Sequence, residues 1–421
     1  MMSHPVALAP DPAVPQRDHL LDPDDIARRL SARLGVNGSV DIRSCRLGSI
    51  CYQPNRRLRV VYELRIDGRD VHVAAGTFPS RSRSERAFWE ATDAARHSGP
   101  VRPVVYDTGL DTVFWTFPND RKLLNLPAAV EARKDLTRLV DRRWASSLLV
   151  DYNAESSAVV RCLDDSHRIV AYAKVHPGDE GERTLRVHSA LSNLARESGP
   201  RIARPLAYSE QHRTLMVEPI EGTSIRSLTG TELAAGLHAY GAALAKLHSL
   251  PPDSVGTGGR DELERLRRRA DGVRMVLPDM ADDISELLDE LAVRWADAHE
   301  PSVPIHGDTN ENNAILEGDH IALIDFDRAC VGAAASDVGN FLSLLRFFRA
   351  LGLLTPADER ARADAFTRGY ASVRPLPAED CLRMHESAGL AERAFRAVIR
   401  LRGSVLPRIP ALLAEARGLL R

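Results

Sequence analysis

Apolar and polar residues alternate in short runs along the N-terminal part of the chain, which is the pattern of half-buried β-strands. Residues 58–66 and 71–75 alternate in this way on either side of Asp67-Gly68, a dipeptide that favours a tight hairpin turn. Upstream, residues 26–34 carry apolar side chains at helical spacing behind a capping segment that begins at Asp22. The pattern predicts a helix followed by a β-hairpin.

A degenerate repeat spans the first half of the chain. Residues 44–120 recur at 144–221, and each copy reads as a hairpin, a helix and further strand. The paired positions are Tyr52 and Tyr152, Val60 and Val160, Glu85 and Glu182, Ser98 and Ser198, Arg102 and Arg204, and Tyr106 and Tyr208. Because these pairs occur in the same order, chance similarity is a poor explanation. We expect two copies of one β-hairpin–helix–β unit.

The second half of the chain changes to a helical pattern, with apolar residues recurring near every 3.6 positions. Helices are predicted over residues 233–247, 281–299, 337–354, 356–370 and 378–420. The segment that joins the two copies, 121–143, also predicts a helix, and the Pro- and Gly-rich segment 251–259 predicts a loop. The fold class is therefore α+β, with a small duplicated sheet unit before a mainly helical part.

These patterns divide the chain into four parts. Residues 1–18 are rich in proline and are expected to form a flexible arm. The other predicted parts are an N-terminal cap domain at 19–143, a β-sheet lobe at 144–222 and a helical lobe at 223–421.

The overall composition excludes several classes of function. The 56 Lys and Arg residues nearly balance the 58 Asp and Glu residues, and a net charge of −2 favours neither nucleic acid nor an anionic membrane as a partner. The five cysteines contain no CxxC pair, which argues against a zinc site and fits a reducing compartment. No apolar run approaches the roughly 18 residues of a membrane span. A soluble cytoplasmic protein is expected.

A short segment in the helical half combines the groups that phosphoryl transfer needs. His306-Gly-Asp308 is followed by Asn313, and a predicted β-hairpin then leads to Asp325 at the end of an apolar strand. Asp308 can accept the proton of a hydroxyl group, while Asn313 and Asp325 offer hard oxygen ligands for Mg²⁺. Asp327 is expected beside this metal site. His306 is grouped with the catalytic residues, although a hydrogen-bonded structural role fits it better than that of a base.

A lone lysine lies in the second copy, within the apolar strand 170–175. Its charge is costly there unless it is used, so Lys174 is expected to bind the phosphates of ATP. Glu182, at the start of the next helix, is the expected ion-pair partner. The plainer interpretations are an edge-strand lysine and a glutamate placed at a helix N-terminus by the helix dipole.

The segment 215–222 is expected to connect the two lobes and to hold the adenine against apolar side chains and backbone groups. Pro219 has no N–H, so the donor to adenine must be a neighbour such as Ile220. The expected nucleotide-binding residues of this connector are Met216, Glu218 and Ile220.

These motifs together resemble the aminoglycoside phosphotransferase and choline-kinase-like family. The resemblance rests on His306-Gly-Asp308, Asn313 and Asp325-Phe-Asp327, on Leu244-Ala-Lys-Leu-His248, and on Val217-Glu218 with Gly222. It covers roughly residues 145–370 and implies a bilobal protein-kinase-like fold, here with an extra N-terminal degenerate copy of the N-lobe. It implies ATP and Mg²⁺ as cofactors, Asp308 as the base, Asn313 and Asp325 as metal ligands, Lys174 as the phosphate-binding lysine, and Asp337 as a brace of the catalytic loop.

Three features depart from the family's pattern, and one is the N-terminal repeat, which the family does not generally carry. The turn around residues 151–157, which should cover the nucleotide phosphates, contains no glycine. No glutamate occurs near Val187 and His188, where the family's helix glutamate usually lies. Glu182 is therefore a substitute candidate for that role.

The expected function is ATP- and Mg²⁺-dependent phosphorylation of a hydroxyl on a small polar metabolite, such as an aminoglycoside, an amino sugar or another sugar. The acceptor is expected near Arg346, Glu386 and the C-terminal helices. The alternatives are a catalytically silent pseudokinase that serves as a binding or scaffold protein, and a protein kinase.

The first copy of the repeat is expected to have no chemistry of its own. It has Gly76 at the position equivalent to Lys174, so it cannot bind ATP in the same way. We expect it to pack on the second copy as a cap, or to form a homodimer surface. Its predicted helix would use the face of Phe88, Trp89, Ala91 and Ala95 for this packing.

Overall fold

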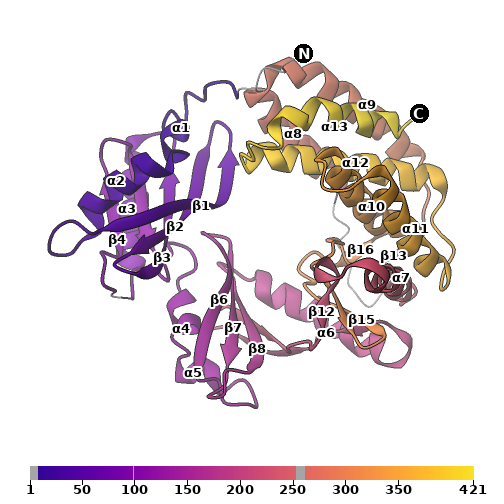
Figure 1. Ribbon diagram of the computed structural model, residues 1–421, viewed down its shortest axis with the longest axis horizontal. Helices are drawn as coiled ribbons and strands as arrows, with labels where there is room; N and C mark the ends of the chain where they lie inside the picture. Colours follow the sequence, from indigo (N-terminus) through magenta and orange to yellow (C-terminus); the bar gives the residue numbers. More distant parts are fainter. Residues whose placement is uncertain (1–7, 98, 253–260) are drawn as a thin grey trace.

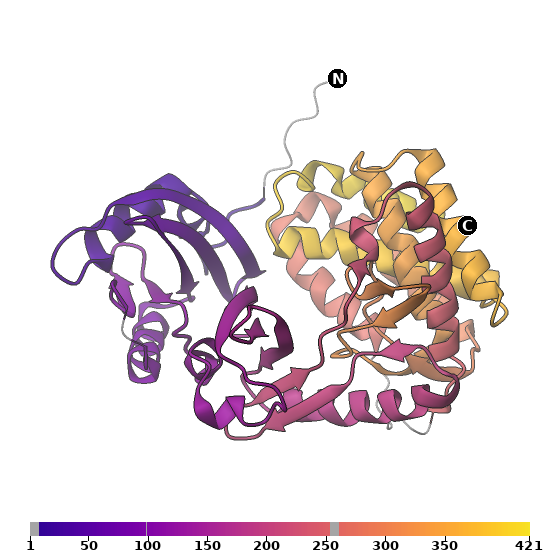
Figure 2. The same cartoon turned by 60° about the horizontal axis from the view of Figure 1, so that its bottom comes forward.

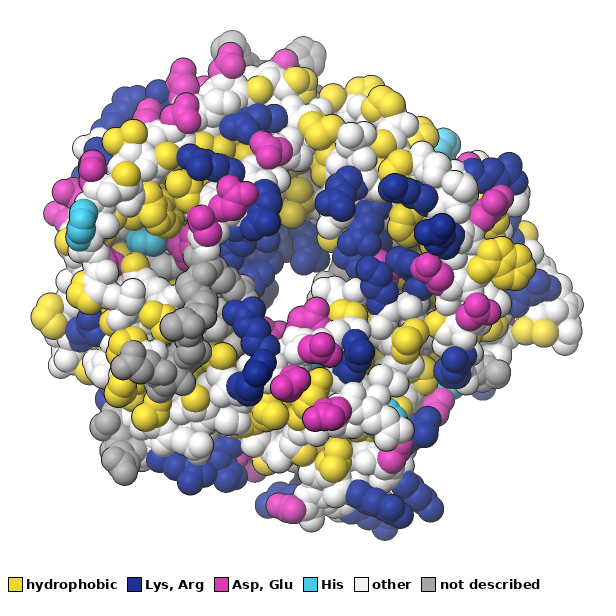
Figure 3. Space-filling model, turned by 180° about the vertical axis from the view of Figure 1, so that it is seen from behind, with side chains coloured by type: hydrophobic (Ala, Val, Ile, Leu, Met, Phe, Trp, Pro, Cys, Tyr) yellow, Lys and Arg dark blue, Asp and Glu magenta, His cyan; other side chains and the backbone are white. Residues whose placement is uncertain are grey.

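The computed structural model describes residues 8–97, 99–252 and 261–421. Two sheet units and a helical lobe surround a central opening (Figure 1), and the second sheet unit lies between the other two parts (Figure 2). The opening passes through the space-filling surface, and Lys and Arg side chains gather at its edge (Figure 3). The molecule is therefore a ring of three parts.

The first unit is one antiparallel sheet in the order β1-β2-β3-β5-β4, with its helices beside it. Its elements are α1 (Arg17–Leu20), α2 (Pro23–Leu34), β1 (Ile42–Gln53), β2 (Arg57–Ile66), β3 (Arg69–Thr77), α3 (Arg81–Ala94), β4 (Val104–Asp107) and β5 (Thr112–Thr116). The predicted hairpin is confirmed as β2–β3, and its turn places Asp67 at φ 47° and Gly68 at φ 78°. The predicted helix is confirmed as α2, capped by the Asp22 carboxylate.

The second unit repeats this topology, because its sheet has the order β6-β7-β8-β11-β10. Its elements are β6 (Ser146–Asn153), β7 (Ser157–Leu163), β8 (Ile169–Val175), α6 (Glu180–Ser198), β9 (Arg201–Ile202), β10 (Pro205–Ser209) and β11 (Thr214–Val217). In both units a hairpin and a third strand precede one helix and a final hairpin. Of the paired sequence positions, Ser98 lies outside the described residues.

The two units also share a local device at the turn of the first hairpin. In the first unit the Tyr52 hydroxyl donates to Asp11 at 2.6 Å, and the Asn55 amide donates to the same carboxylate at 2.9 Å. In the second unit the Tyr152 hydroxyl donates to Asp120 at 2.8 Å, and the Glu155 amide donates to the same carboxylate at 2.8 Å. A carboxylate therefore fixes each turn from outside the sheet.

The strand register places Gly76 and Lys174 at equivalent sites. Gly76 lies opposite Arg59 on β2, and Lys174 lies opposite Val159 on β7. The two partners, Arg59 and Val159, are one hundred positions apart, which is the offset of the repeat. A Cβ atom on Gly76 would lie 3.2 Å from the Trp115 ring, which is tighter than ordinary contact. The first unit thus has an indole packed where a lysine side chain would start.

The packing of the first unit on the second is confirmed by a buried ion cluster and a shared apolar core. Glu155, in the β6–β7 turn, is paired with Arg57 at 3.1 Å and with Arg59 at 3.5 Å. Arg121 donates to the same carboxylate at 2.8 Å. Three arginines from the N-terminal side of the chain therefore hold the turn that was expected to cover a nucleotide.

Three expectations for the N-terminal part are wrong. Of the arm expected at 1–18, residues 1–7 lie outside the described residues, and residues 8–18 are not loose, since Val14 is fully buried and Asp11 binds Tyr52. The joining segment 121–143 contains only two short helices, α4 (Leu126–Val130) and α5 (Lys134–Thr137). On α3 the Trp89 side chain is exposed, so it does not belong to the packing face.

The helical lobe contains four helices close to their predicted positions and a small sheet that carries the site. Its elements are β12 (Thr223–Ser224), α7 (Gly230–Leu247), α8 (Glu262–Val276), α9 (Ala281–Asp297), β13 (Ser302–Ile305), β14 (Ala314–Glu317), β15 (His320–Leu323), β16 (Cys330–Ala333), α10 (Ala334–Ala350), α11 (Pro356–Ala371), α12 (Glu379–Ile399) and α13 (Ile409–Gly418), with short 3₁₀ turns at Ile225–Ser227, Pro278–Met280 and Leu406–Arg408. The single helix expected over 378–420 is wrong, because α12 ends at Ile399. Most of the expected loop 251–259 lies outside the described residues.

The N-terminal segment closes the ring by packing on the helical lobe. The Ala9 amide donates to the Val276 carbonyl at 2.9 Å, and one apolar cluster contains residues of both the first unit and helices α8, α9, α12 and α13. None of the helices in the described ranges has the length and apolarity that crossing a bilayer requires.

We predict that Glu155→Gln destabilises the protein by about 3 kcal/mol, because it leaves three neighbouring arginines without their buried counter-charge. Urea unfolding followed by circular dichroism measures this change. The control is Glu85→Gln, which removes an exposed i,i+4 pair with Arg81 and should cost less than about 0.5 kcal/mol. Equal effects of the two substitutions would contradict a role for Glu155 in joining the units.

Candidate active site

The predicted catalytic segment forms a loop between β13 and β14, followed by the hairpin β14–β15. The two halves are tied together, since the His306 ring nitrogen Nε2 lies 2.9 Å from the Ile324 carbonyl and the Ile324 amide donates to the Asn313 carbonyl at 3.1 Å. His306 is completely buried. These contacts support a structural role for His306.

Asp337 braces this loop from the first turn of α10, as the resemblance implies. Its carboxylate accepts the amides of His306 at 2.6 Å and Gly307 at 2.8 Å, and His248 Nε2 lies 3.1 Å away. Burial alone would raise the pKa of Asp337, but the hydrogen bond from His248 and the neighbouring charges hold it below its ordinary value. The His248 ring in turn bonds the Tyr370 hydroxyl at 2.9 Å.

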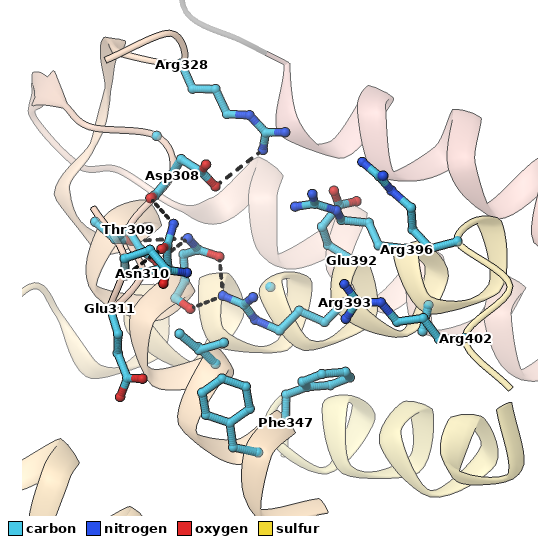
Figure 4. Close-up of a pocket in the computed structure, with 18 of the residues that line it drawn as sticks. Asp308, Thr309, Asn310, Glu311, Arg328, Phe347, Glu392, Arg393, Arg396 and Arg402 are labelled. Carbon is cyan, nitrogen blue, oxygen red and sulfur yellow. Dashed lines mark hydrogen bonds and ion pairs between the residues drawn. The ribbon is translucent and has the colours of Figure 1, made fainter. Parts of the chain in front are cut away.

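Asp308 is the partly exposed carboxylate of the loop. Its backbone carbonyl accepts the side-chain amides of Asn310 and Asn313, each at 2.9 Å. Its side chain points toward Arg328, whose guanidinium lies 3.6 Å away (Figure 4). The backbone of Asp308 is therefore fixed, while its carboxylate stays accessible to an incoming hydroxyl group.

Lys174 reaches from β8 to the end of the catalytic hairpin. Its Nζ lies 3.0 Å from Asp325 Oδ1, and it also pairs with Asp327. Burial tends to lower the pKa of Lys174, but the two carboxylates outweigh this and raise it. The structure thus brings together a lysine and two aspartates that lie more than one hundred positions apart in the sequence.

The expected pairing of Lys174 with Glu182 is wrong in this structure, because Glu182 is exposed and Lys174 is paired with the two aspartates. The buried residue of α6 beside the site is His188, whose ring lies 5.1 Å from that of Phe326. A buried imidazole thus occupies the region where the family's helix glutamate usually lies.

The connector after β11 differs in part from expectation. Met216 is fully buried in the apolar cluster between the two sheets, so its side chain does not border an open cleft. The Glu218 carboxylate accepts from Arg201 at 2.6 Å and from Arg204 at 2.9 Å, which makes it a brace of the connector. Ile220 is half-buried, and its amide donates to no group in the described part of the chain. It remains a candidate donor to adenine.

A cavity of about 790 Å³ lies on one side of Asp308. It is lined by the catalytic loop, by α8, α10 and α12, and by Leu47–Ile50 of β1. The expected acceptor residues Arg346 and Glu386 are not among its lining residues, since they pair with each other instead. Sequence reasoning missed Arg265, Arg328 and Arg396, which do line the cavity. Of these three, only Arg328 could have been found from a motif, because it directly follows Asp325-Phe-Asp327.

Three comparisons place the chain among known proteins. The model of a family described as the phosphotransferase enzyme family matches residues 151–376. A homoserine kinase from Beijerinckia indica subsp. indica is 35% identical over 151 residues, which are 34% of this chain and 44% of that protein. The chain therefore spans less than half the length of this curated relative.

Solved structures show the same fold at low sequence identity. The crystal structure of aminoglycoside phosphotransferase APH(4)-Ia has a TM-score of 0.51 and 18% identity, over 68% of this chain and 98% of that one. A thermostable mutant of the same enzyme, in a ternary complex with ADP and hygromycin B, has a TM-score of 0.51 and 16% identity over the same shares of the two chains. The protein-kinase-like fold expected from the motifs is confirmed.

The burial of His188 leads to a prediction on pH. Burial lowers its pKa to about 4, against the opposing hydrogen bond with the Ala203 backbone. Between about pH 6.5 and that value the unfolded chain holds a proton that the folded chain lacks, so stability falls as the pH falls. From pH 7 to about pH 4.5 this group should remove about 2–3 kcal/mol of unfolding free energy.

Urea unfolding at both pH values tests this expectation. His188→Phe should remove that part of the pH dependence, while exposed His320→Phe should leave it intact. If the two variants keep the same pH dependence as the unmodified protein, His188 is not the titrating group.

Proposed function

The chain belongs to the phosphotransferase enzyme family, and on that premise we propose that it is an ATP-dependent kinase of a small molecule with a hydroxyl group. One observation carries the proposal. Asp308, on a loop braced by buried Asp337, presents its carboxylate to a large cavity. Lys174 and Asp325 do not line this cavity, and they would receive the phosphates of the nucleotide.

Each of these residues has its own role in the proposed reaction. Asp308 would accept the proton of the acceptor hydroxyl as its oxygen attacks the γ-phosphorus of ATP. The new O–P bond forms, the bond from phosphorus to the β–γ bridging oxygen breaks, and ADP leaves. Lys174 would bind phosphate oxygens, and the Ile220 amide would bind the adenine. Most of the catalytic effect comes from positioning and charge, because the reacting groups are held by a fixed loop.

The donor set fits Mg²⁺. Asp325 and Asp327 already converge on one cation, the Lys174 ammonium group. Asn313 uses its side-chain N–H on the Asp308 carbonyl, which leaves its oxygen for a metal. Asn313 and Asp325, with Asp327 beside them, would hold a Mg²⁺ ion that neutralises phosphate charge. Lys174 would then exchange its carboxylate partners for the nucleotide.

The acceptor must be inferred from this chain's own cavity. The curated relative is named as a homoserine kinase, whereas a structural neighbour was solved with hygromycin B. A pseudokinase is the alternative, but the complete set of Lys174, Asp308, Asn313 and Asp325 gives no support to a silent site.

The N-terminal unit serves in this proposal as a cap over the acceptor side. Its strand β1 contributes Leu47–Ile50 to the cavity wall, at a bulge where the pairing with β2 shifts register. This goes beyond packing alone, since the unit also shapes the acceptor space. A homodimer through the same unit remains a prediction.

We predict that Asp308→Asn lowers the rate of phosphoryl transfer by about two to four orders of magnitude, because the hydroxyl proton loses its acceptor. Binding of the analogue AMP-PNP, measured by calorimetry, should persist. Asp319→Asn, in the exposed turn of the same hairpin, is the control. More than about a tenth of normal turnover in Asp308→Asn would rule out its role as the base.

We also predict that Asp325→Ala abolishes the tightening of AMP-PNP binding by Mg²⁺, because the metal loses a carboxylate ligand. Calorimetric titrations with and without Mg²⁺ measure the difference. Asp165→Ala, in the exposed β7–β8 turn, should keep the full metal dependence. An unchanged metal effect in Asp325→Ala would mean that this aspartate is structural.

A further inference from the structure

The cavity beside Asp308 is rich in arginine. Its lining includes Arg265 of α8, Arg328 after β15, Arg393 and Arg396 of α12, and Arg400 and Arg402 just beyond that helix. In the close-up, Arg328, Arg396 and Arg402 extend around the space in front of Asp308 (Figure 4). Lys and Arg side chains also gather above and to the left of the central opening, while Asp and Glu side chains lie at its lower right edge (Figure 3).

Several of these arginines have no carboxylate in direct contact within the described residues. Arg265, Arg396 and Arg402 form no ion pair and donate no side-chain hydrogen bond within the ranges that the structure describes. Arg265 even has its Nε buried without a partner. Burial and the neighbouring arginines lower the pKa of Arg396, and the charge of Asp308, which acts in the opposite direction, does not outweigh them.

Six acidic residues line the same cavity. Asp308 faces Arg328, Asp337 is paired with His248, and within the described residues Asp151 accepts only from the Asn153 side-chain amide, while the three glutamates are paired with other groups. Glu262 lies 3.2 Å from the His385 ring and accepts from Ser336. Glu311 pairs with Arg362 at 3.2 Å. Glu392 pairs with Arg269, which does not line the cavity. Arg265, Arg396 and Arg402 therefore outnumber Asp151, the lining carboxylate without an ion pair in the described residues, and the charge left over in the cavity is positive.

A positive cavity selects among acceptors. A cationic acceptor such as an aminoglycoside would add like charges to an already uncompensated set, whereas a carboxylate or phosphate would pair with guanidinium groups through strong, charge-assisted hydrogen bonds. The apolar side chains of Leu344 and Phe347 on the same wall can contact a carbon skeleton.

We propose that the acceptor is an anionic small molecule, a hydroxyl compound bearing a carboxylate or a phosphate, whose anionic group is bound by Arg265 and Arg396 while its hydroxyl faces Asp308. The phosphorylation of this hydroxyl rests on the proposed kinase function. The preference of the cavity for an anion does not depend on that function. The arginines fix the orientation of the acceptor, and the neutral and cationic sugars expected from the family resemblance are disfavoured.

A set of probes that differ in charge on one carbon skeleton tests the proposal. Glucose, glucosamine, glucose 6-phosphate and gluconate are titrated by calorimetry into the full chain, with the nucleotide site saturated by AMP-PNP and Mg²⁺. At least one of the two anionic probes should bind about tenfold or more tightly than glucose, and glucosamine most weakly. Comparison of glucose 6-phosphate with gluconate tells phosphate from carboxylate.

Variants assign the preference to its residues. Arg396→Gln and Arg265→Gln should each reduce the anion preference by about tenfold, without changing AMP-PNP affinity. Arg267→Gln, exposed on the same helix as Arg265, is the matched control and should change nothing. The proposal is overturned if glucosamine or glucose binds at least as tightly as both anions, if no probe binds, or if the preference survives in both variants.

The same titrations separate this inference from the kinase proposal. If AMP-PNP fails to bind while the anion preference persists and depends on Arg265 and Arg396, the anionic cavity is supported and the kinase function is rejected. If AMP-PNP binds with Mg²⁺ and only neutral or cationic probes bind in the cavity, the kinase function stands and the anionic acceptor is rejected.

Discussion

The active-site loop depends on one buried carboxylate, that of Asp337. A charge without solvent is costly, and here the cost is offset by two backbone amides and the His248 ring. Those three bonds fix the loop before Asp308, the end of α7 and the start of α10 relative to one another. Gly307 permits the arrangement, because its φ is 73° and a Cβ atom there would lie 2.4 Å from the Arg328 carbonyl.

Charge is arranged differently on the two sides of this loop. On one side Lys174 pairs with both Asp325 and Asp327, so its charge offsets one of the two carboxylates, and a carboxylate charge remains for the metal of the proposed reaction. On the other side Arg328 faces Asp308 at 3.6 Å, and Arg265, Arg396 and Arg402 line the same cavity without an ion pair in the described residues. Asp308 is therefore the boundary between a region with carboxylate charge and a positive one. In the proposed reaction this boundary is where the acceptor oxygen meets phosphorus.

Local signals in the sequence predicted the parts of the fold and site that depend on local physics. The Asp67-Gly68 turn, the cap at Asp22 and the spacing from His306 to Asp325 are short-range features, and all three lie where they were expected. The partner of Lys174 was misjudged. Choosing between Glu182 and the two aspartates requires knowing how strand β8 is placed relative to the segment that follows β15. Met216 was misjudged for a similar reason, because its burial depends on how the sheets of the two units pack into one apolar cluster.

The arginine cavity could not have been read from the sequence. Its members come from α8, from the strand end after β15 and from α12, so they are scattered over more than a hundred positions among many other arginines. Charged residues predominate in α8, yet Leu266 and Ala270 are buried and Arg265 is half-buried against the cavity. Tertiary packing decides which of several similar charges lose access to water.

The N-terminal unit explains how the β6–β7 turn can function without glycine. Glu155 in that turn has φ 58°, a left-handed conformation that costs a non-glycine residue about 1 kcal/mol or more. The strain is held by Asp120, which accepts the Glu155 amide, and by Arg57, Arg59 and Arg121, which pair with its side chain. In the first unit the corresponding turn is fixed by Asp11 in the same way. The first unit therefore supplies by external contacts the rigidity that a glycine-rich turn would lack, and it joins the β6–β7 turn to strand β1, which borders the arginine cavity.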